Sequence, residues 1–317
     1  MNKKLGEHAV ELGLGTWGLA GEGVISGAKY GWAKLDSKVA IETIREAFDL
    51  GIRFYDTADF YGLGLAEELL AKALPPNADV VIASKGGMFV ENSRVVKSFN
   101  STYIEEAVHA SLKRLRRQRI DVYQLHGPHE SVLWDDSIWS KLEMLVRDGK
   151  IGEFGVALGS SLTESTLRDW INIKGLNWLQ IPYSVAVPDI VNQVEESDFL
   201  EASKIKLIGR SLFHHGILLK EQAPRKNYER ADFRSTIATP KFIAQVEKFW
   251  AYSSAEGEKL RSCLSVAMSS ERLSTALVGA SNPSQIRQLV ESANLAVSLS
   301  SGERDLLLKQ ASWSFSR

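Results

Sequence analysis

The chain alternates short apolar runs with longer segments of helical periodicity, roughly eight times along its 317 residues. Apolar runs of this length are typical of buried strands. Strands that are separated by helices pair in parallel through right-handed crossovers. Eight such units in a chain of this length predict an α/β fold, a closed (β/α)8 TIM barrel with long loops on its C-terminal face, rather than an open doubly wound sheet.

The expected elements follow one another in a regular order. We expect strands at 12–15, 52–55, 80–83, 122–125, 153–157, 178–181, 205–208 and 274–278. We expect helices at 37–50, 66–74, 102–115, 135–147, 163–173, 194–202, 285–293 and 302–310, with more helical sequence between 241 and 269. Asp36 or Ser37 and Ser101 are candidate N-caps. The least periodic segment, 216–240, is expected to form a long loop after the seventh strand.

Composition excludes several classes of protein. The chain has 38 basic and 39 acidic residues, and its densest basic cluster, 113–119, ends an expected helix, where cations are favoured. Its one cysteine, Cys263, excludes internal disulfides and a cysteine-based metal site. No apolar run approaches the ~18 residues of a membrane span. We expect one cytoplasmic domain over 1–317 that binds neither nucleic acid nor membranes and holds no metal.

Four polar residues lie at or near the ends of the second, third and fourth expected strands. Asp56, Lys85 and His126 each follow an apolar run, and Tyr61 lies five residues after Asp56. Residues at the ends of parallel barrel strands converge on one face. There, Lys85 is expected to lower the pKa of Tyr61 from its usual value of about 10. A phenol tuned in this way can protonate a carbonyl oxygen.

A glycine motif near the N-terminus invites a different interpretation. Residues 13–18 match the G-x-G-x-x-G pattern of dinucleotide binding, and Asp36 follows at about the right distance. That pattern requires the last glycine to open a helix whose N-terminus holds the phosphates. No helical periodicity precedes Asp36, so the sequence disfavours a Rossmann fold.

Motifs along the whole chain resemble those of the aldo-keto reductase superfamily. The resemblance is carried by Asp56-Thr-Ala-x-x-Tyr61-Gly, by Lys85 and by Leu125-His126-Gly-Pro. It continues at 14–18, 149–151, 180–184 and 278–281. It implies a (β/α)8 barrel that binds NADP or NAD across its C-terminal face. Tyr61 would be the general acid or base, Lys85 paired with Asp56 would tune it, and His126 would orient the carbonyl.

The same resemblance implies two further sets of contacts. The cofactor would be held by residues from five parts of the chain, namely Gly15, Thr16, Trp17, Asp56, Gln180, Arg210, Ser211, Phe213, Gly216, Gly279, Ser281 and Gln285. The substrate would lie against aromatic and basic side chains, for which the candidates are Trp17, Tyr30, Trp134 and Arg210.

The sequence departs from the family pattern in the cofactor site. Ala157 and Leu158 replace the Ser and Asn that commonly hold the carboxamide, and Leu289 replaces an Asn at the adenine. Arg210 replaces a common aromatic residue. Its fixed charge would disfavour NAD⁺ relative to NADH if it stacked on the ring, or it would reach an anionic substrate. No cation lies within 279–285 to bind a 2′-phosphate, so both NAD and NADP stay open.

These features predict an NAD(P)-dependent oxidoreductase that interconverts a carbonyl and an alcohol by hydride transfer. The expected substrate is a small molecule, namely an aldehyde, a ketone or a sugar lactol or lactone. Two alternatives remain. One is a redox-neutral epimerase or lyase with a retained cofactor, and the other is a non-catalytic regulatory subunit that senses cofactor. The oligomeric state is open.

Overall fold

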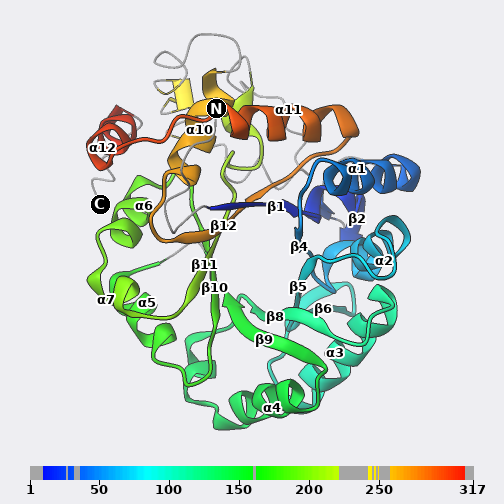
Figure 1. The fold of residues 1–317 in the computed structure, drawn as a ribbon. Coiled ribbons are helices and arrows are strands. Elements are labelled where there is room, and N and C mark those ends of the chain that lie inside the picture. Colours follow the sequence, from blue (N-terminus) through cyan, green and yellow to red (C-terminus); the bar gives the residue numbers. More distant parts are fainter. Residues whose placement is uncertain are drawn as a thin grey trace.

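Eight parallel strands close into a barrel in the order β1-β12-β11-β10-β9-β8-β5-β4 (Figure 1). The computed structural model describes residues 10–25, 28–31, 36–159, 162–220, 242–244, 246–247, 249 and 258–310. The barrel strands are β1 (Glu11–Gly15), β4 (Phe54–Asp56), β5 (Val81–Gly86), β8 (Ile120–His126), β9 (Ile151–Ala157), β10 (Trp178–Pro182), β11 (Lys206–Arg210) and β12 (Leu273–Val278). This order confirms the predicted (β/α)8 barrel and excludes the Rossmann interpretation of residues 13–18.

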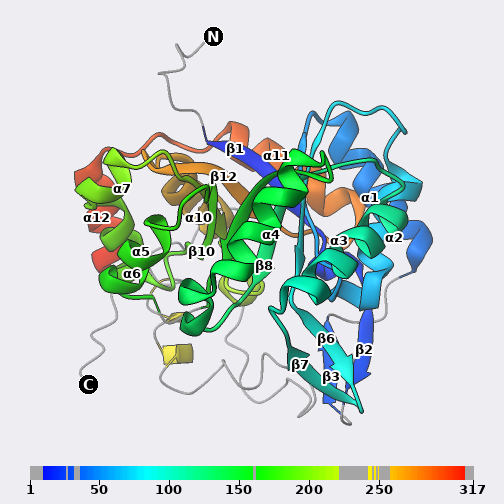
Figure 2. The ribbon, with the colours of Figure 1, turned by 90° about the horizontal axis from the view of Figure 1, so that it is seen from below.

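Helices surround the barrel on its outside (Figures 1 and 2). They are α1 (Ser37–Asp49), α2 (Leu65–Ala73), α3 (Ser101–Leu115), α4 (Asp136–Arg147), α5 (Glu164–Ile171), α6 (Pro188–Glu195), α7 (Asp198–Ala202), α10 (Glu258–Met268), α11 (Pro283–Asn294) and α12 (Ser301–Gln310). The described part also contains short 3-10 helices: η1 (Trp17–Leu19), η2 (Tyr61–Gly64), η3 (Glu130–Trp134) and η4 (Ile217–Leu219). Most of the expected long loop lies outside the described residues.

Two sequence expectations about helix boundaries were wrong. The single helix expected at 194–202 is two helices, because Pro188 opens α6 in its first turn, where proline is tolerated, and Ser197 caps α7. The N-cap of α3 is Asn100 rather than Ser101. The amide oxygen of Asn100 accepts from the backbone N–H groups of Thr102 and Tyr103 at 2.9 and 3.4 Å, so it satisfies two of the helix's free donors.

Two small antiparallel hairpins were not predicted. They are β2 (Glu22–Ile25) with β3 (Ala28–Gly31), and β6 (Met88–Glu91) with β7 (Arg94–Lys97). Both extend from the same side of the barrel (Figure 2). Asn92 and Ser93 turn the second hairpin with φ angles of 47° and 59°, as a two-residue hairpin turn requires. β7 is largely exposed, so it lacks the apolar alternation by which a strand is recognised.

The barrel interior is filled by side chains that point inward from six of the eight strands. Phe54, Ala83, Val122, Trp178, Ile208 and Leu277 form this inner layer. The ring centroids of Phe54 and Trp178 are 5.8 Å apart. A Cβ on Gly13 would lie 2.8 Å from the Leu277 side chain, so Gly13 leaves room for that layer. The interior of the barrel below the strand ends is therefore filled with side chains and does not form a channel.

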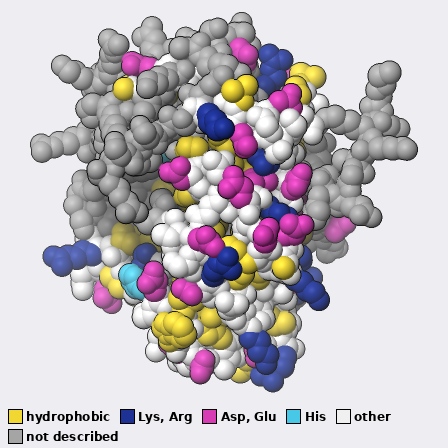
Figure 3. Space-filling view, turned by 90° about the vertical axis from the view of Figure 1, so that its left-hand side faces the viewer, with side chains coloured by type: hydrophobic (Ala, Val, Ile, Leu, Met, Phe, Trp, Pro, Cys, Tyr) yellow, Lys and Arg dark blue, Asp and Glu magenta, His cyan; other side chains and the backbone are white. Residues whose placement is uncertain are grey.

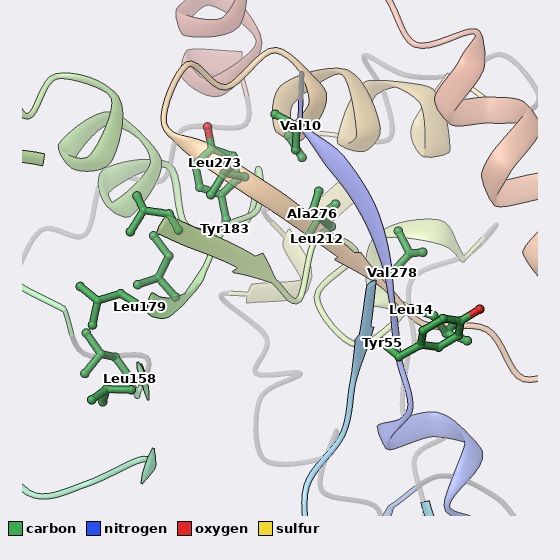
Figure 4. Close-up of a cluster of buried hydrophobic side chains, with 14 of the residues drawn as sticks. Val10, Leu14, Tyr55, Leu158, Leu179, Tyr183, Leu212, Leu273, Ala276 and Val278 are labelled. Atoms are coloured by element: carbon green, nitrogen blue, oxygen red, sulfur yellow. The ribbon is translucent and has the colours of Figure 1, made fainter. Parts of the chain in front are cut away.

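A larger apolar layer lies between the strands and the helices. Leu14, Tyr55 and Val278 belong to it, and Figure 4 shows them on neighbouring strands. Because successive side chains of a strand point to opposite faces, Tyr55 packs outward while Phe54 and Asp56 on either side of it point inward. The outer core thus sets the register that directs Asp56 into the barrel.

The molecular surface carries charges of both signs. Figure 3 shows acidic and basic side chains lying among each other on one face, with small hydrophobic areas between them. In the part of the chain that the structure describes, no helix has both the length and the apolar character needed to cross a membrane.

A buried ionic cluster attaches the last described helix to the barrel. Glu195 of α6 is 9% exposed and accepts a hydrogen bond from Arg304 Nη1 of α12 at 2.9 Å. Its carboxylate also accepts from Tyr183 OH at 2.8 Å and Ser270 Oγ at 2.5 Å. One carboxylate therefore joins α6, α12 and the segment before β12.

We expect Glu195→Ala to lower the free energy of unfolding by about 3–5 kcal/mol, because it leaves the Arg304 charge buried without its partner. Urea unfolding followed by circular dichroism measures the loss. Glu201→Ala is the matched control, since Glu201 pairs with Arg272 at 2.8 Å with its own side chain 64% exposed. That change is expected to cost less than about 1 kcal/mol. Equal losses in the two variants would contradict this account of Glu195.

Candidate active site

Asp56, Lys85 and His126 meet because their strands are parallel and adjacent. Asp56 ends β4, Lys85 lies next to the end of β5, and His126 ends β8. β4 pairs with β5 and β5 pairs with β8, so the ends of the three strands lie side by side at the C-terminal face. Tyr61 begins η2 in the loop after β4. The structure therefore brings the four predicted residues together.

The backbone of the loop after β4 follows the neighbouring strand and so carries Tyr61 over Lys85. Thr57 N–H donates to Ala83 O at 2.8 Å, and Asp59 N–H donates to Lys85 O at 3.1 Å. The chain then turns sharply at Gly62, whose φ is 60°. A Cβ at Gly62 would lie 2.8 Å from the carbonyl oxygen of Ala20, so this turn requires glycine.

Lys85 is the centre of the hydrogen-bond network. Its fully buried Nζ donates to Asp56 Oδ2 at 2.6 Å, to Thr57 O at 2.8 Å and to Tyr61 OH at 3.1 Å. These three acceptors match the three N–H bonds of an ammonium group. Burial acts to lower the pKa of Lys85, but Asp56 and Tyr61 outweigh it and raise the pKa above its usual value. Lys85 therefore stays charged.

Asp56 is fixed from two further sides. Gln180 Nε2 donates to Asp56 Oδ1 at 2.6 Å. The backbone oxygen of Asp56 accepts from Thr16 N–H at 2.9 Å and from Thr16 Oγ1 at 3.0 Å. Thr16 and Gln180, both expected at the cofactor, thus hold Asp56 in place. Thr16 is completely buried, whereas Gln180 also faces the cavity described below.

The pKa of Tyr61 differs from the sequence expectation. Burial raises the pKa of the phenol above 10, and the opposing effect of Lys85 does not cancel it, partly because Asp56 also raises it. Lys85 therefore restrains the rise instead of lowering the pKa below its usual value. At neutral pH Tyr61 carries its proton and can donate it.

His126 faces Tyr61 with its ring nearly perpendicular, and the ring centroids are 5.8 Å apart. Its Nδ1 is buried and has no hydrogen-bond partner within the described part of the protein. Burial, followed by the charges of Lys85, Arg210 and Lys97, holds the pKa of His126 well below its usual range. His126 is therefore neutral at neutral pH, with one ring nitrogen able to donate.

A cavity of about 750 Å³ opens above these residues and extends to the start of α11. Most residues that the sequence placed at the cofactor or substrate line it, namely Gly15, Trp17, Asp56, Tyr61, His126, Gln180, Arg210, Ser211, Phe213, Gly216, Gly279, Ser281 and Gln285. Lys85 lies behind Tyr61 and Asp56 and is not part of the lining. The volume is typical of small-molecule and cofactor sites.

One residue expected at the substrate, Trp134, is not brought to this cavity. Trp134 is in η3, its side chain is 81% exposed, and it is not part of the described lining. The nearby Val132 and Leu133 face the core instead, so the 3-10 turn directs Trp134 outward. Tyr30 lies in β3, and its side chain is outside the described residues.

Sequence reasoning missed several residues of the cavity wall, namely Phe60, Met88, Gly127, Leu212, Leu219, Leu260 and Gln288. Met88 belongs to the unpredicted β6–β7 hairpin, and Leu260 comes from α10, far from any motif. Gln288 was accessible to sequence reasoning, because it lies three residues after Gln285 on the same helix and so on the same face. Phe60 directly precedes Tyr61 and stacks on Trp17 at 6.5 Å between ring centroids.

Arg210 enters the cavity from the end of β11. Its Nη2 donates to Leu158 O at 2.7 Å, and its Nη1 donates to Ser211 Oγ at 3.3 Å. The loop that follows has positive φ angles at Ser211, His214, His215 and Gly216, of 61°, 45°, 58° and 80°. Three of these are not glycine, so the loop holds an unusual backbone shape against the cavity.

The far end of the cavity fits the phosphate-bearing part of a dinucleotide. It lies at the loops after β11 and β12, the seventh and eighth strands, where many barrels bind phosphate. A Cβ built on Gly279 meets no atom within 4 Å, so the backbone there is open to a ligand. Ser281 N–H and Oγ both donate to Gln285 Oε1 at 2.9 Å, which shapes the turn into α11.

Arg287 of α11, two residues after Gln285, points away from this end. Its Nη1 lies 2.9 Å from Glu46 Oε1 of α1. Among the described lining residues, the only cation is Arg210. Leu289 is buried in the wall, and Ala157 and Leu158 line the cavity beside Gln180.

We expect the free energy of unfolding to fall as the pH drops below about 6.5, partly because of His126. Below that pH the unfolded chain binds a proton at this histidine, while the folded chain does not. His214, whose pKa burial lowers to about 4, acts in the same direction. His126→Gln should therefore reduce the difference in unfolding free energy between pH 7.5 and 5.0, measured by urea titration. An unchanged difference would contradict the neutral state of His126. His109→Gln, on the exposed side of α3, is the control and should leave the difference unchanged.

Comparison with known proteins places the chain in a family. Residues 11–303 match the aldo/keto reductase family. The chain is 32% identical over 255 residues to the aldo-keto reductase YhdN of Bacillus subtilis, covering 79% of this chain and 71% of that protein. The glycerol dehydrogenase AKR11B4 of Gluconobacter oxydans superposes with a TM-score of 0.76 at 25% identity over 94% of this chain and 90% of its own.

A second solved structure has the same fold. The aldo-keto reductase AKR11C1 of Bacillus halodurans superposes with a TM-score of 0.74 at 23% identity, over 98% of this chain and 96% of that one. Together with the family match over 11–303, the barrel and the converged strand ends identify the chain. It belongs to the aldo/keto reductase family of NAD(P)-dependent oxidoreductases.

Proposed function

We propose that this protein reduces the carbonyl group of a small molecule to an alcohol, and catalyses the reverse oxidation, with Tyr61 as the general acid and base. The observation that carries the proposal is the contact between Lys85 Nζ and Tyr61 OH at 3.1 Å, with the same ammonium 2.6 Å from Asp56. When bound, the reduced nicotinamide supplies the hydride. The chain supplies the proton, the orientation and the dry surroundings.

Tyr61 gives its phenolic proton to the carbonyl oxygen as negative charge develops there. The tyrosinate that remains lies against the Lys85 ammonium, which stabilises it by charge attraction and a hydrogen bond. Asp56 holds that ammonium at one position, and Gln180 holds Asp56. The arrangement is therefore preorganised for proton transfer in both directions. In the oxidative direction the tyrosinate accepts the proton of the alcohol.

His126 orients the carbonyl. As a neutral imidazole it donates one hydrogen bond to the carbonyl oxygen without competing with Tyr61 as an acid. Trp17 lies edge-on to Tyr61 with 4.8 Å between the ring centroids, and Phe60 stacks on Trp17. These rings exclude water from the reacting atoms, which strengthens the charge interactions that Lys85 and His126 make there.

Substrate class follows from the walls near Tyr61. Trp17, Phe60 and Met88 provide apolar surface, while His126 and the Gly127 backbone are polar. Such a mixture suits an aldehyde, a ketone or a sugar lactol or lactone that carries hydroxyl groups. The name of the related glycerol dehydrogenase refers to a polyol, which supports this class.

NAD is favoured over NADP as the cofactor. At the far end of the cavity the described lining is uncharged, with Ser281, Gln285, Gln288 and Leu289, and Arg287 is engaged with Glu46. Selectivity for a 2′-phosphate depends on charge-assisted hydrogen bonds, for which these residues offer no cation. The intact tetrad also favours a catalyst over a regulatory subunit that only senses cofactor.

Tyr61→Phe should lower kcat for aldehyde reduction by about 10²–10⁴-fold, because it removes the proton donor and little volume. Cofactor binding, measured by isothermal titration calorimetry, should change little. The control is Tyr103→Phe, a tyrosine of α3 that packs on Phe89 away from the cavity. Full activity in Tyr61→Phe would refute its role as the acid.

NADH should give a higher kcat/KM than NADPH, and Gln288→Arg should shift this ratio toward NADPH by about tenfold, because it adds a cation at the cavity wall. Arg287→Ala should leave the ratio unchanged, since Arg287 faces Glu46. Steady-state rates with both cofactors at one aldehyde concentration measure the ratio. A strong NADPH preference that Arg287→Ala abolishes would contradict this assignment.

A further inference from the structure

Among the described residues that line the cavity, Arg210 is the one lysine or arginine, and its two hydrogen-bond acceptors, Leu158 O and Ser211 Oγ, carry no charge. Lys85 and Asp56 form a pair at 2.6 Å and cancel each other. Tyr61 keeps its proton and His126 is neutral, for the reasons given above. Among the described residues, the catalytic end of the cavity therefore has a net charge of about +1, and an arginine keeps that charge at any ordinary pH.

The surrounding charges do not remove this excess. Lys97, whose Nζ donates to Gly127 O at 2.6 Å, adds a second positive charge near His126. On the outer side of β5, Arg114 Nε pairs with Glu67 at 2.6 Å. Asp59, whose pKa burial raises to about 7, is not part of the cavity lining. Counted over the residues that the structure describes, the charge around the catalytic end of the cavity is thus positive.

The guanidinium is held rigidly where it is. Leu158 O and Ser211 Oγ accept from its two terminal nitrogens, which tie it to the end of β9 and to its own loop. It lines the cavity together with Tyr61, His126 and Gln180, and its charge acts on both Tyr61 and His126. These two hydrogen bonds place the guanidinium at the catalytic end of the cavity rather than toward its mouth.

The proposed reaction places a nicotinamide ring near this charge. Hydride passes directly to a carbonyl carbon whose oxygen is at Tyr61 and His126, so the donor ring has to contact that carbon. The oxidised ring carries a positive charge and the reduced ring is neutral, while the two forms are otherwise nearly identical. A cation beside the ring weakens binding of the positively charged oxidised ring and has little effect on the neutral reduced ring. The other contacts with the nucleotide are the same for both forms, so they do not change the ratio of the two dissociation constants.

We propose that Arg210 makes the site select the reduced over the oxidised nicotinamide nucleotide. Unit charges about 6–10 Å apart at an effective dielectric constant of about 20 change the ratio of dissociation constants by roughly 10–100-fold. A site with this bias loads the reduced nucleotide in the presence of excess oxidised nucleotide and releases the oxidised product readily. This inference rests on the proposed function and gives it a direction, namely reduction.

The test is titration calorimetry of the full-length protein with NADH and with NAD⁺, repeated with the phosphorylated pair. In the wild type, Kd for the oxidised form should exceed Kd for the reduced form by about tenfold or more. Arg210→Met should bring this ratio close to one, and Arg210→Lys, which retains a charge, should keep most of it. Arg287→Met removes a cation that faces Glu46 and should leave the ratio unchanged.

The outcomes separate the inference from the proposed function. Equal ratios in wild type and Arg210→Met would overturn the inference, as would an equal weakening of both forms, which a merely structural role predicts. A selective loss of kcat/KM for succinic semialdehyde relative to butanal in Arg210→Met, with the nucleotide ratio unchanged, would also overturn it and assign the charge to the substrate. Absence of binding of any nucleotide to the wild type would overturn the proposed function and the inference together.

Discussion

The buried ion pair between Lys85 and Asp56 is the interaction on which the site depends. Taking two charges out of water is costly, and the cost is offset only where every remaining donor and acceptor is satisfied. Here Thr57, Tyr61 and Gln180 complete the set, at distances of 2.6 to 3.1 Å. The partners come from the end of β4, from η2 and from β10, so the complete network requires β4, β5 and β10 to be in place in the closed barrel.

Burial then determines the protonation states of the other groups. The same exclusion of water raises the pKa of Tyr61 and lowers that of His126, so both are neutral at neutral pH. In the proposed reaction Tyr61 therefore acts as an acid, and His126 as a donor that does not give up its proton. In the same proposal Lys85 stabilises the tyrosinate that forms during the reaction rather than ionising Tyr61 in the free enzyme. The charge of Lys85 alone predicts a lowered pKa for Tyr61. The pKa is raised instead, because burial has a larger effect on it than Lys85 does.

Arg210 illustrates how a departure from a family pattern becomes interpretable once its contacts are known. From the sequence alone, Arg210 could either stack on a cofactor ring or bind a substrate anion. Its hydrogen bonds to Leu158 and Ser211 hold the charge at the catalytic end of the cavity. The interpretation that follows is an effect on the relative affinity for reduced and oxidised nucleotide, and so on the direction of the reaction. Arg287 shows the reverse case, because its pairing with Glu46 directs a cation of α11 away from the cavity.

The sequence by itself determined the barrel and the four residues at its strand ends. The alternation of apolar runs with helical periods is a local signal, and residues that end adjacent parallel strands have to converge. Asp56, Tyr61, Lys85 and His126 followed from that rule and from the family motif. Only the tertiary structure decided the sign of the Tyr61 pKa shift, the role of Gln180 as a partner of Asp56, the outward position of Trp134 and the contributions of Met88 and Leu260 to the cavity. These depend on how deeply a group is buried and on which distant elements pack beside it, and neither quantity is encoded in the spacing of residues along the chain.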